Sequence, residues 1–243
     1  MCIRDRPKGI AYTADITDIK RSENEVSCAV IKDGGDDPDV TTGAYIYASV
    51  RILHSDTSAL CKKKQDLVII NIDGGDGVGR VTKPGLDQPV GNAAINHVPR
   101  EMIEKEVREV CELLDFKGTL DITISVPKGK ELAERTFNPR LGIVGGISIL
   151  GTSGIVEPMS SQALIDTIRV ELRQRYSFGY DYVAVAPGNY GLDFMKESYG
   201  YDLDRSVKCS NFIGETIDMA ADMGFKRMLL TGHIGTVSYT HLT

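Results

Sequence analysis

The chain has 243 residues, a formal net charge of −6 and 42% hydrophobic residues, values that are typical of a globular protein with a large buried core. The acidic balance argues against a nucleic-acid partner, because such domains carry a basic excess, although a small anionic ligand needs only a local basic pocket. Apolar runs such as LVIINI are too short to span a bilayer, so no membrane partner is expected.

The two ends of the chain differ from the segments that they flank. Residues 1–6 (MCIRDR) and 236–243 (TVSYTHLT) match neither the composition nor the periodicity of their neighbours. We expect these residues to be foreign and the chain to be a fragment of a longer protein. Cys2 and His241 lie in these ends and are therefore not expected to belong to a functional site.

The first half of the chain is predicted to group its strands before a helix. Three segments rich in β-branched and aromatic residues predict strands, at Val26–Lys32, Ala44–Leu53 and Leu67–Ile72. A helix is expected from about Pro99, and a further strand at Leu120–Val126. This order predicts an α+β domain over residues 7–140.

The second half alternates helices and strands. Helices are expected at about Ser160–Tyr176 and Ser210–Met223, and strands at Tyr182–Ala186 and Arg227–Leu230. Alternation of this kind predicts right-handed crossovers and a parallel sheet. The fold class is therefore predicted to be α/β with two domains, the second being an incomplete three-layer α/β domain over residues 141–235 with a boundary near Arg140.

The segment 74–91, GGDGVGRVTKPGLDQPVG, directly follows a predicted strand end, where open sheets present ligands. Its glycines let the backbone approach a ligand closely. Asp73 and Asp76 are candidates to accept hydrogen bonds, and Arg80 and Lys83 are candidates to pair with carboxylates. The alternative is a long surface loop whose glycines and prolines only turn the chain.

A second glycine-rich segment, GIVGGISILGTSGIVEP, spans 142–158 and precedes a predicted helix. Its spacing is not GxGxxG, and Glu157 comes early for an acid that binds a ribose. The segment suits either a nucleotide-containing ligand or close helix–sheet packing, and both alternatives stay open. Arg135 and Arg140 lie just upstream and suit carboxylate binding, with solvated surface arginines as the alternative.

Metal and hydrolase motifs are absent from the sequence. The acidic loop DGGDDPDVTT lacks the alternation of a calcium loop, and His54, His97 and His233 have no HxxxH or CxxC partners, so no metal site is expected. No GxSxG or P-loop motif occurs. Asn189 in APGNYG and His233 both follow predicted strands, where substrate-facing loops belong, although a turn asparagine and a surface histidine are the simpler interpretations. The five cysteines form no CxxC pair, which favours free thiols in a reducing cytoplasm.

Several segments together resemble one family. They are DGGDDPDVTTG, GGDGVGRVTKPGLDQPVGNAAIN, ERTFNPRLGIVGGISILGTSGIVEPMS, APGNYG, CSNFIGETID and LLTGHIG. In this order they resemble the cobalt-precorrin-5B (C-1)-methyltransferases of anaerobic cobalamin synthesis, through nearly all of residues 26–235. The family's chain is longer at both ends.

The resemblance implies a cytoplasmic enzyme that uses S-adenosylmethionine as methyl donor and converts cobalt-precorrin-5B to cobalt-precorrin-6A. It also implies a two-domain α/β architecture unlike the commoner methyltransferase folds. Two positions depart from the family pattern, since Thr42 stands where a histidine is expected and His97 where a proline is expected. These departures argue against an acid–base role at position 42 and against a catalytic role for His97.

The implied substrate is a flat anionic cobalt tetrapyrrole, so its site needs local cations. The candidate substrate-binding residues are Asp76, Arg80, Lys83, Arg135 and Arg140. The candidate residues for binding the methyl donor are Gly145, Gly146, Gly151, Thr152, Gly154, Glu157 and Asn189. We name no catalytic acid or base, because methyl transfer requires alignment and exclusion of water more than a nucleophilic side chain.

Two alternatives of other classes stay open. A non-catalytic corrinoid carrier would need the same cations and glycine loops but no S-adenosylmethionine. A nicotinamide-dependent reductase would need a dinucleotide site, against which the missing GxGxxG motif argues. A homodimer is an open expectation, because symmetric dimers are the commonest oligomers.

Overall fold

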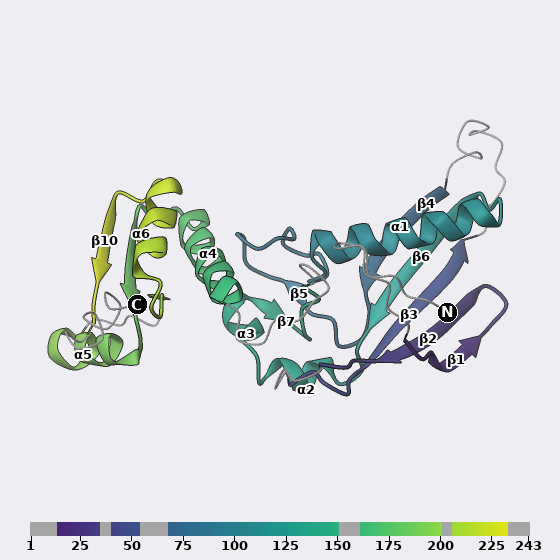
Figure 1. Ribbon diagram of the computed structural model, residues 1–243, viewed down its shortest axis with the longest axis horizontal. Helices are drawn as coiled ribbons and strands as arrows, with labels where there is room; N and C mark the ends of the chain where they lie inside the picture. Colours follow the sequence, from purple (N-terminus) through teal and green to yellow (C-terminus); the bar gives the residue numbers. More distant parts are fainter. Residues whose placement is uncertain (1–13, 35–39, 54–67, 151–160, 201–205, 233–243) are drawn as a thin grey trace. The chain divides into compact units, whose positions relative to one another are not determined.

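The chain is a mixed α/β protein with three β-sheets among the residues that its computed structural model describes. These residues are 14–34, 40–53, 68–150, 161–200 and 206–232. The chain forms two compact units, of which the first comprises residues 1–82 and 87–158 and the second comprises residues 83–86 and 159–243 (Figure 1). The boundary expected near Arg140 falls inside the first unit.

The main sheet of the first unit has five strands in the order β1-β2-β3-β6-β4. The strands are β1 (Thr17–Arg21), β2 (Glu25–Ile31), β3 (Tyr45–Leu53), β4 (Val68–Gly74) and β6 (Gly118–Ser125). Neighbours run antiparallel except β4 and β6, which are parallel. Parallel neighbours require a long crossover connection, and the segment between β4 and β6 contains helix α1 (His97–Leu113).

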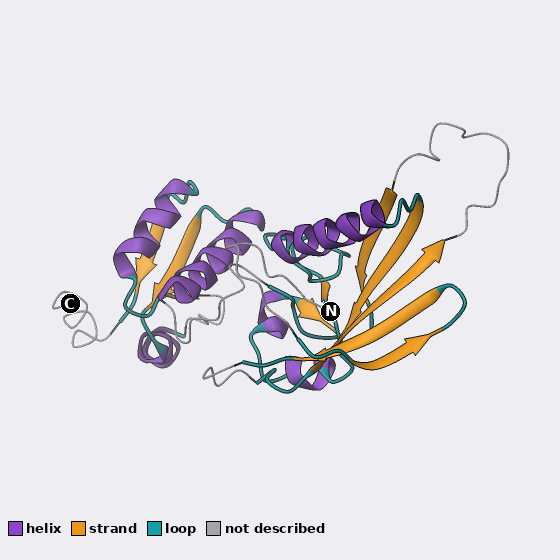
Figure 2. Cartoon of the chain, turned by 45° about the vertical axis from the view of Figure 1, so that its right-hand side comes forward, coloured by secondary structure: helices purple, strands orange, loops and turns teal. Residues whose placement is uncertain are grey.

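One face of this sheet carries the core of the first unit. Val50 of β3 is paired with Ile122 of β6, and both belong to this core. Helix α1 lies along β4 and β6 in both views (Figures 1 and 2). It packs Ile103 and Val107, four positions apart and therefore on one side of the helix, against the core.

The opposite face of the sheet is polar, as strict alternation along a strand requires. Ser49 donates a hydrogen bond of 2.9 Å to Ser27 across β2 and β3. Arg51, two positions further along β3, forms a 2.6 Å ion pair with Glu25. The sheet therefore presents apolar side chains to α1 and polar side chains on its other side.

Short elements complete the first unit near the glycine-rich segments. Strands β5 (Arg80–Val81) and β7 (Ile143–Val144) form a two-stranded antiparallel sheet. Two short helices, α2 (Gly129–Ala133) and α3 (Asn138–Leu141), lie between β6 and β7 in the sequence. The small β5–β7 sheet joins segments more than sixty residues apart, so the two glycine-rich segments are neighbours in space.

The second unit has a three-stranded parallel sheet in the order β10-β8-β9. Its strands are β8 (Tyr182–Ala186), β9 (Val207–Lys208) and β10 (Arg227–Leu230), and its helices are α4 (Ser161–Ser177), α5 (Asn189–Tyr199) and α6 (Ile213–Asp222). Helix α4 packs against α6 and β9. Leu172, Val185 and Val207 are almost fully buried between these elements and form the centre of the second core.

The predicted elements of the second unit are largely confirmed. Strands β8 and β10 have the predicted bounds, and α4 and α6 differ from their predictions by a few residues at each end. Helix α5 and the two-residue strand β9 were not predicted. Within the described residues, no helix is both long and apolar enough to cross a membrane.

Candidate functional site

The two glycine-rich segments form one hydrogen-bonded junction in the first unit. Gly79 donates its N–H to the carbonyl of Ile147 at 2.9 Å, and Ile147 donates to the carbonyl of Gly77 at 3.0 Å. Val126, which directly follows β6, donates to the carbonyl of Asp76 at 2.7 Å. The backbone groups of the first segment are thus satisfied mainly by the second segment and by the end of β6.

Glycine is required in this junction because backbones meet there without room for side chains. A Cβ on Gly77 would lie 1.7 Å from the carbonyl oxygen of Val126. A Cβ on Gly146 would lie 2.1 Å from the carbonyl oxygen of Gly77, and one on Gly129 would lie 2.0 Å from the same oxygen. Three glycines therefore converge around the carbonyl of Gly77, which supports close packing as the reason for Gly146.

A bidentate ion pair lies at the exit of β4. Arg80 Nη1 donates to Asp73 Oδ1 at 2.7 Å, and Arg80 Nη2 donates to Asp73 Oδ2 at 2.8 Å and to the carbonyl of Gly74 at 3.0 Å. These hydrogen bonds from Arg80 hold the pKa of the Asp73 carboxyl below its ordinary value, against the opposing effect of partial burial. The side chains of Arg80 and Asp73 are 43% and 58% exposed, so a ligand carboxylate could reach the guanidinium.

Arg100 in the first turn of α1 fixes the same strand end from the other side. Its guanidinium donates to the carbonyls of Ile95 at 2.8 Å, Ile72 at 2.7 Å and Ala93 at 3.4 Å. Its positive charge also contributes to lowering the pKa of Asp73. Arg100 therefore links the first turn of α1 to the end of β4 and to the segment just before the helix.

The other predicted substrate-binding residues lie around this junction or in the second unit. Asp76 is exposed in the turn between β4 and β5, and Arg135 is exposed between α2 and α3. Arg140 is half-buried in α3. Lys83 belongs to the second unit, where the segment 83–86 packs on α4, since a Cβ on Gly85 would lie 2.8 Å from the Cα of Gln174.

The described members of the predicted donor-binding set belong to both compact units. Gly145 is exposed with a φ of 87°, and no atom lies within 4 Å of the position that a Cβ would take, whereas its neighbour Gly146 is buried in the junction. Asn189 is the first residue of α5 in the second unit, and it accepts a 2.6 Å hydrogen bond from Lys208. The remaining four lie outside the described residues, namely Gly151, Thr152, Gly154 and Glu157.

Asp87 and His97 form a contact that the sequence did not suggest. Asp87 Oδ1 accepts the backbone N–H of His97 at 2.8 Å, which caps the first turn of α1, and its Oδ2 contacts Nδ1 of His97. The Asp87 carboxylate raises the pKa of the His97 imidazole, first by its hydrogen bond and then by its charge. The nine residues between them include one proline and one glycine, so no regular spacing indicated this contact.

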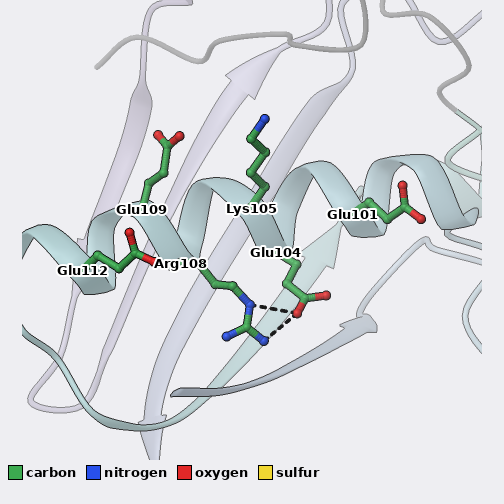
Figure 3. A pocket seen from close by; sticks show the side chains of 6 residues that line it. All are labelled: Glu101, Glu104, Lys105, Arg108, Glu109 and Glu112. Carbon is green, nitrogen blue, oxygen red and sulfur yellow. Dashed lines mark hydrogen bonds and ion pairs between the residues drawn. The ribbon is translucent and has the colours of Figure 1, made fainter. Parts of the chain in front are cut away.

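A hollow on the outer side of α1 is lined by charged side chains of that one helix (Figure 3). Arg108 pairs there with Glu104, four positions earlier, at 2.6 Å. A row of charges with ordinary helical spacing is typical of a solvated helix surface. In the described residues no group of three or more His, Cys, Asp or Glu side chains could hold a metal ion.

Comparison with known proteins identifies the family. A family model described as CbiD matches residues 3–158. The chain belongs to the CbiD family. It is 50% identical over 233 residues to the cobalt-precorrin-5B C(1)-methyltransferase of Ruminiclostridium cellulolyticum, covering 96% of this chain and 57% of that protein. It is 48% identical over 231 residues to the protein of the same name from Alkaliphilus metalliredigens, covering 95% of this chain and 57% of that protein.

This CbiD chain therefore spans less than two thirds of the length of the curated relatives that it matches. One solved structure, described as a cobalamin biosynthesis protein (cbiD) from Archaeoglobus fulgidus, is 21% identical and has a TM-score of 0.44. That match covers 96% of this chain and 68% of the solved chain. The family assignment rests on the sequence match and not on this structural likeness.

Proposed function

We propose that this chain is part of a cobalt-precorrin-5B C(1)-methyltransferase, which transfers a methyl group from S-adenosylmethionine to C-1 of cobalt-precorrin-5B and yields cobalt-precorrin-6A. The observation that carries the proposal is the 50% identity over 233 residues to a curated relative of that name. The match extends over 96% of the chain and thus includes both compact units. We also propose that the first unit is an α+β domain and the second a three-layer parallel α/β domain.

The proposed reaction is attack by an electron-rich ring carbon on the sulfonium methyl group. A carbon–carbon bond forms, the carbon–sulfur bond breaks with its electron pair going to sulfur, and S-adenosylhomocysteine leaves. Holding the two reactants in line supplies about 7–11 kcal/mol of barrier reduction in favourable cases. The chain's task in this proposal is therefore to bind, align and dehydrate two ligands, and no side chain is assigned as acid or base.

We propose that the junction of the first unit contacts the tetrapyrrole. The support for this is a rigid, exposed strand end with a guanidinium beside it, formed by Asp73, Arg80 and Arg100. A substrate carboxylate would approach Arg80 in competition with Asp73, so binding would replace one exposed ion pair by another. Asp76, Lys83, Arg135 and Arg140 stay as proposed contacts, and each requires its own substitution.

The donor part of the proposal is tested by titrating S-adenosylhomocysteine into the folded chain by calorimetry, with NADH as the control ligand. Saturable binding of S-adenosylhomocysteine without a response to NADH is the expected result. Binding of NADH instead would favour a reductase. A folded chain that binds neither ligand, compared with a full-length relative that binds S-adenosylhomocysteine, would place the donor site in the part of the family that this chain does not span. Absence of binding by both would favour a corrinoid carrier.

The substrate part is tested with Arg80→Ala and with Arg108→Ala as a matched control. Each arginine has a partly exposed side chain and pairs with one carboxylate, but Arg108 lies on α1, where it pairs with Glu104 and donates to the carbonyl of Val68 at 3.3 Å. Arg80→Ala should weaken binding of a carboxylated cobalt corrin by about two- to fivefold, because the exchange of one exposed ion pair for another leaves a net contribution of up to about 1 kcal/mol. Equal affinities of the two variants would show that the junction is not the tetrapyrrole site.

The cellular location and assembly belong to the same proposal. Cys28, Cys111 and Cys209 are free thiols, which suits the reducing cytoplasm that we propose for this enzyme. A homodimer is a prediction that analytical ultracentrifugation of the purified chain would test.

A further inference from the structure

Positive charge at the N-terminus of α5 comes from the helix terminus itself and from Lys208 of β9, which contacts Asn189. Neither has a negatively charged partner among the described residues. Its N-cap residue, Gly188, provides no side-chain hydrogen bond, and its first turn contains no acidic residue. The backbone N–H groups of that turn lack intrahelical acceptors, and the helix dipole adds a partial positive charge. Lys208 donates to Asn189 Oδ1 at 2.6 Å, and no carboxylate of the described chain lies within ion-pair distance of its ammonium group.

A buried hydroxyl without a partner faces the same turn of α5. Thr231 continues the pairing of β10, since its N–H donates to the carbonyl of Val185 at 2.9 Å. The residue is 9% exposed, and its buried Oγ1 has no hydrogen-bond partner among the described residues. A Cβ placed on Gly191, in the first turn of α5, would lie 3.1 Å from that oxygen. Because buried hydroxyls are nearly always hydrogen-bonded, an unpaired one here indicates a missing partner at the helix terminus.

These groups gather at one edge of the parallel sheet. Lys208 is the last residue of β9, Thr231 directly follows β10, and Gly188 lies in the short turn between β8 and α5. The carboxyl ends of parallel strands meet at one edge, which is where open α/β sheets bind ligands. A Cβ on Gly188 would meet no atom within 4 Å, so there is open space beside the helix terminus.

We propose that this corner, formed by Gly188, Asn189, Gly191, Lys208 and Thr231, binds a carboxylate group of a ligand. A carboxylate accepts hydrogen bonds from the first-turn N–H groups and from the Thr231 hydroxyl, and it neutralises the Lys208 ammonium. The inference rests on the proposed methyl transfer, in which two molecules carry carboxylates. One is the amino-acid end of the methyl donor, and the other is the set of acid side chains on the tetrapyrrole.

The test uses Lys208→Gln and Thr231→Val, with Lys196→Gln as the matched control. Lys196 is in the last turn of α5, so its substitution removes the same charge from the other end of the same helix. Calorimetric titration of S-adenosylhomocysteine should give an affinity that is lower by about tenfold or more in Lys208→Gln, because a hydrogen bond to a charged group is lost. Lys196→Gln should bind as the parent chain does.

Two ligand comparisons identify the source of the carboxylate. If the donor supplies it, a decarboxylated analogue of S-adenosylhomocysteine binds the parent chain and Lys208→Gln with equal affinity. If the tetrapyrrole supplies it, S-adenosylhomocysteine binds both chains equally, whereas a cobalt corrin with free acid side chains loses affinity in Lys208→Gln. The corresponding corrin with amidated side chains would then show no such loss.

The inference would be overturned, with the proposed function left intact, if Lys208→Gln and Thr231→Val bound both S-adenosylhomocysteine and the carboxylated corrin with the affinity of the parent chain. If the parent chain binds neither ligand, that result concerns the proposed function alone, and titration with sodium acetate decides the inference. Acetate should cause saturable changes in the NMR signals of the Asn189 and Gly191 amides. Loss of these changes in Lys208→Gln but not in Lys196→Gln would support a carboxylate site. Unchanged signals would refute it.

Discussion

Gly77 is the residue of the junction at which substitution by alanine should be most damaging. Its φ is 71°, and its Cβ position lies 1.7 Å from the carbonyl oxygen of Val126 and 3.0 Å from the nitrogen of Gly129. Both contacts are with backbone atoms, so rotation of a side chain cannot relieve them. An alanine at position 77 must therefore separate the first glycine-rich segment from the end of β6.

The magnitude follows from a matched comparison with Gly43. Gly43 has a similar φ of 78°, but no atom lies within 4 Å of its Cβ position. Gly43→Ala should therefore show only the conformational cost of a left-handed alanine, about 1–2 kcal/mol. Gly77→Ala adds the cost of overpacking, about 1–3 kcal/mol, for a total loss of about 2–5 kcal/mol in the free energy of unfolding.

Native-state hydrogen exchange is the assay of choice, because the chain has two compact units and a single global unfolding transition need not apply. The amides to follow are those of Val126 and Ile147, which donate to Asp76 and Gly77 in the junction. Both should lose protection in Gly77→Ala, whereas the amide of Val183 in the second core should not change. If Gly77→Ala and Gly43→Ala reduce the protection of the junction amides equally, close backbone packing is not what requires glycine at position 77.

Three further predictions concern titratable groups. Arg80→Gln should return the pKa of Asp73, measured by NMR, towards its ordinary value of 3.8. The lowered pKa stabilises the parent chain above pH 3.8, and this stability is lost as pH falls from there through the lowered pKa; the loss should be smaller in Arg80→Gln. Asp87 raises the pKa of His97 above 6.5, so the stability that protonated His97 contributes is present below pH 6.5 and is lost as pH rises through the raised pKa. Urea unfolding of the parent chain should show this loss of stability, and urea unfolding of His97→Gln should not. Burial raises the pKa of Cys209 to about 11, so iodoacetamide at pH 8 should label this thiol in peptide maps only after unfolding in urea.

The sequence was sufficient to predict the elements that are long or regularly patterned. Strand β8 is a continuous run of Val and Ala between turn formers, and its predicted bounds are the observed ones. Strand β1 reads TDIKR, a charged segment at the edge of the sheet, and its pairing with β2 is a consequence of tertiary contacts. Strand β9 has two residues, too few for any period to be visible, although it positions Lys208 at the sheet edge.

The contacts of the candidate site were less predictable than its location. The sequence indicated that the strand end and the segment 74–91 after it carry candidate acids and bases, but it did not indicate that Arg80 would pair with Asp73. That pairing depends on the turn that brings β5 back beside the end of β4, and the turn depends on contacts between Gly77 and residues about fifty to seventy positions away. Residue patterns within a short segment of sequence do not predict contacts between residues so far apart in the chain.

The existing partners of Arg80, Arg100 and Lys208 determine where a ligand carboxylate can bind most strongly. Arg100 is committed to three backbone carbonyls, and Arg80 already holds a carboxylate of its own chain. A carboxylate that binds to Arg80 or Arg100 therefore does so by replacing an existing partner, which costs part of the energy gained. Among the described residues, the ammonium group of Lys208 is hydrogen-bonded to the neutral amide of Asn189 and to no carboxylate, so a carboxylate at that position forms an ion pair without breaking one there. On this ground, affinity for a carboxylate should depend more strongly on Lys208 than on Arg80.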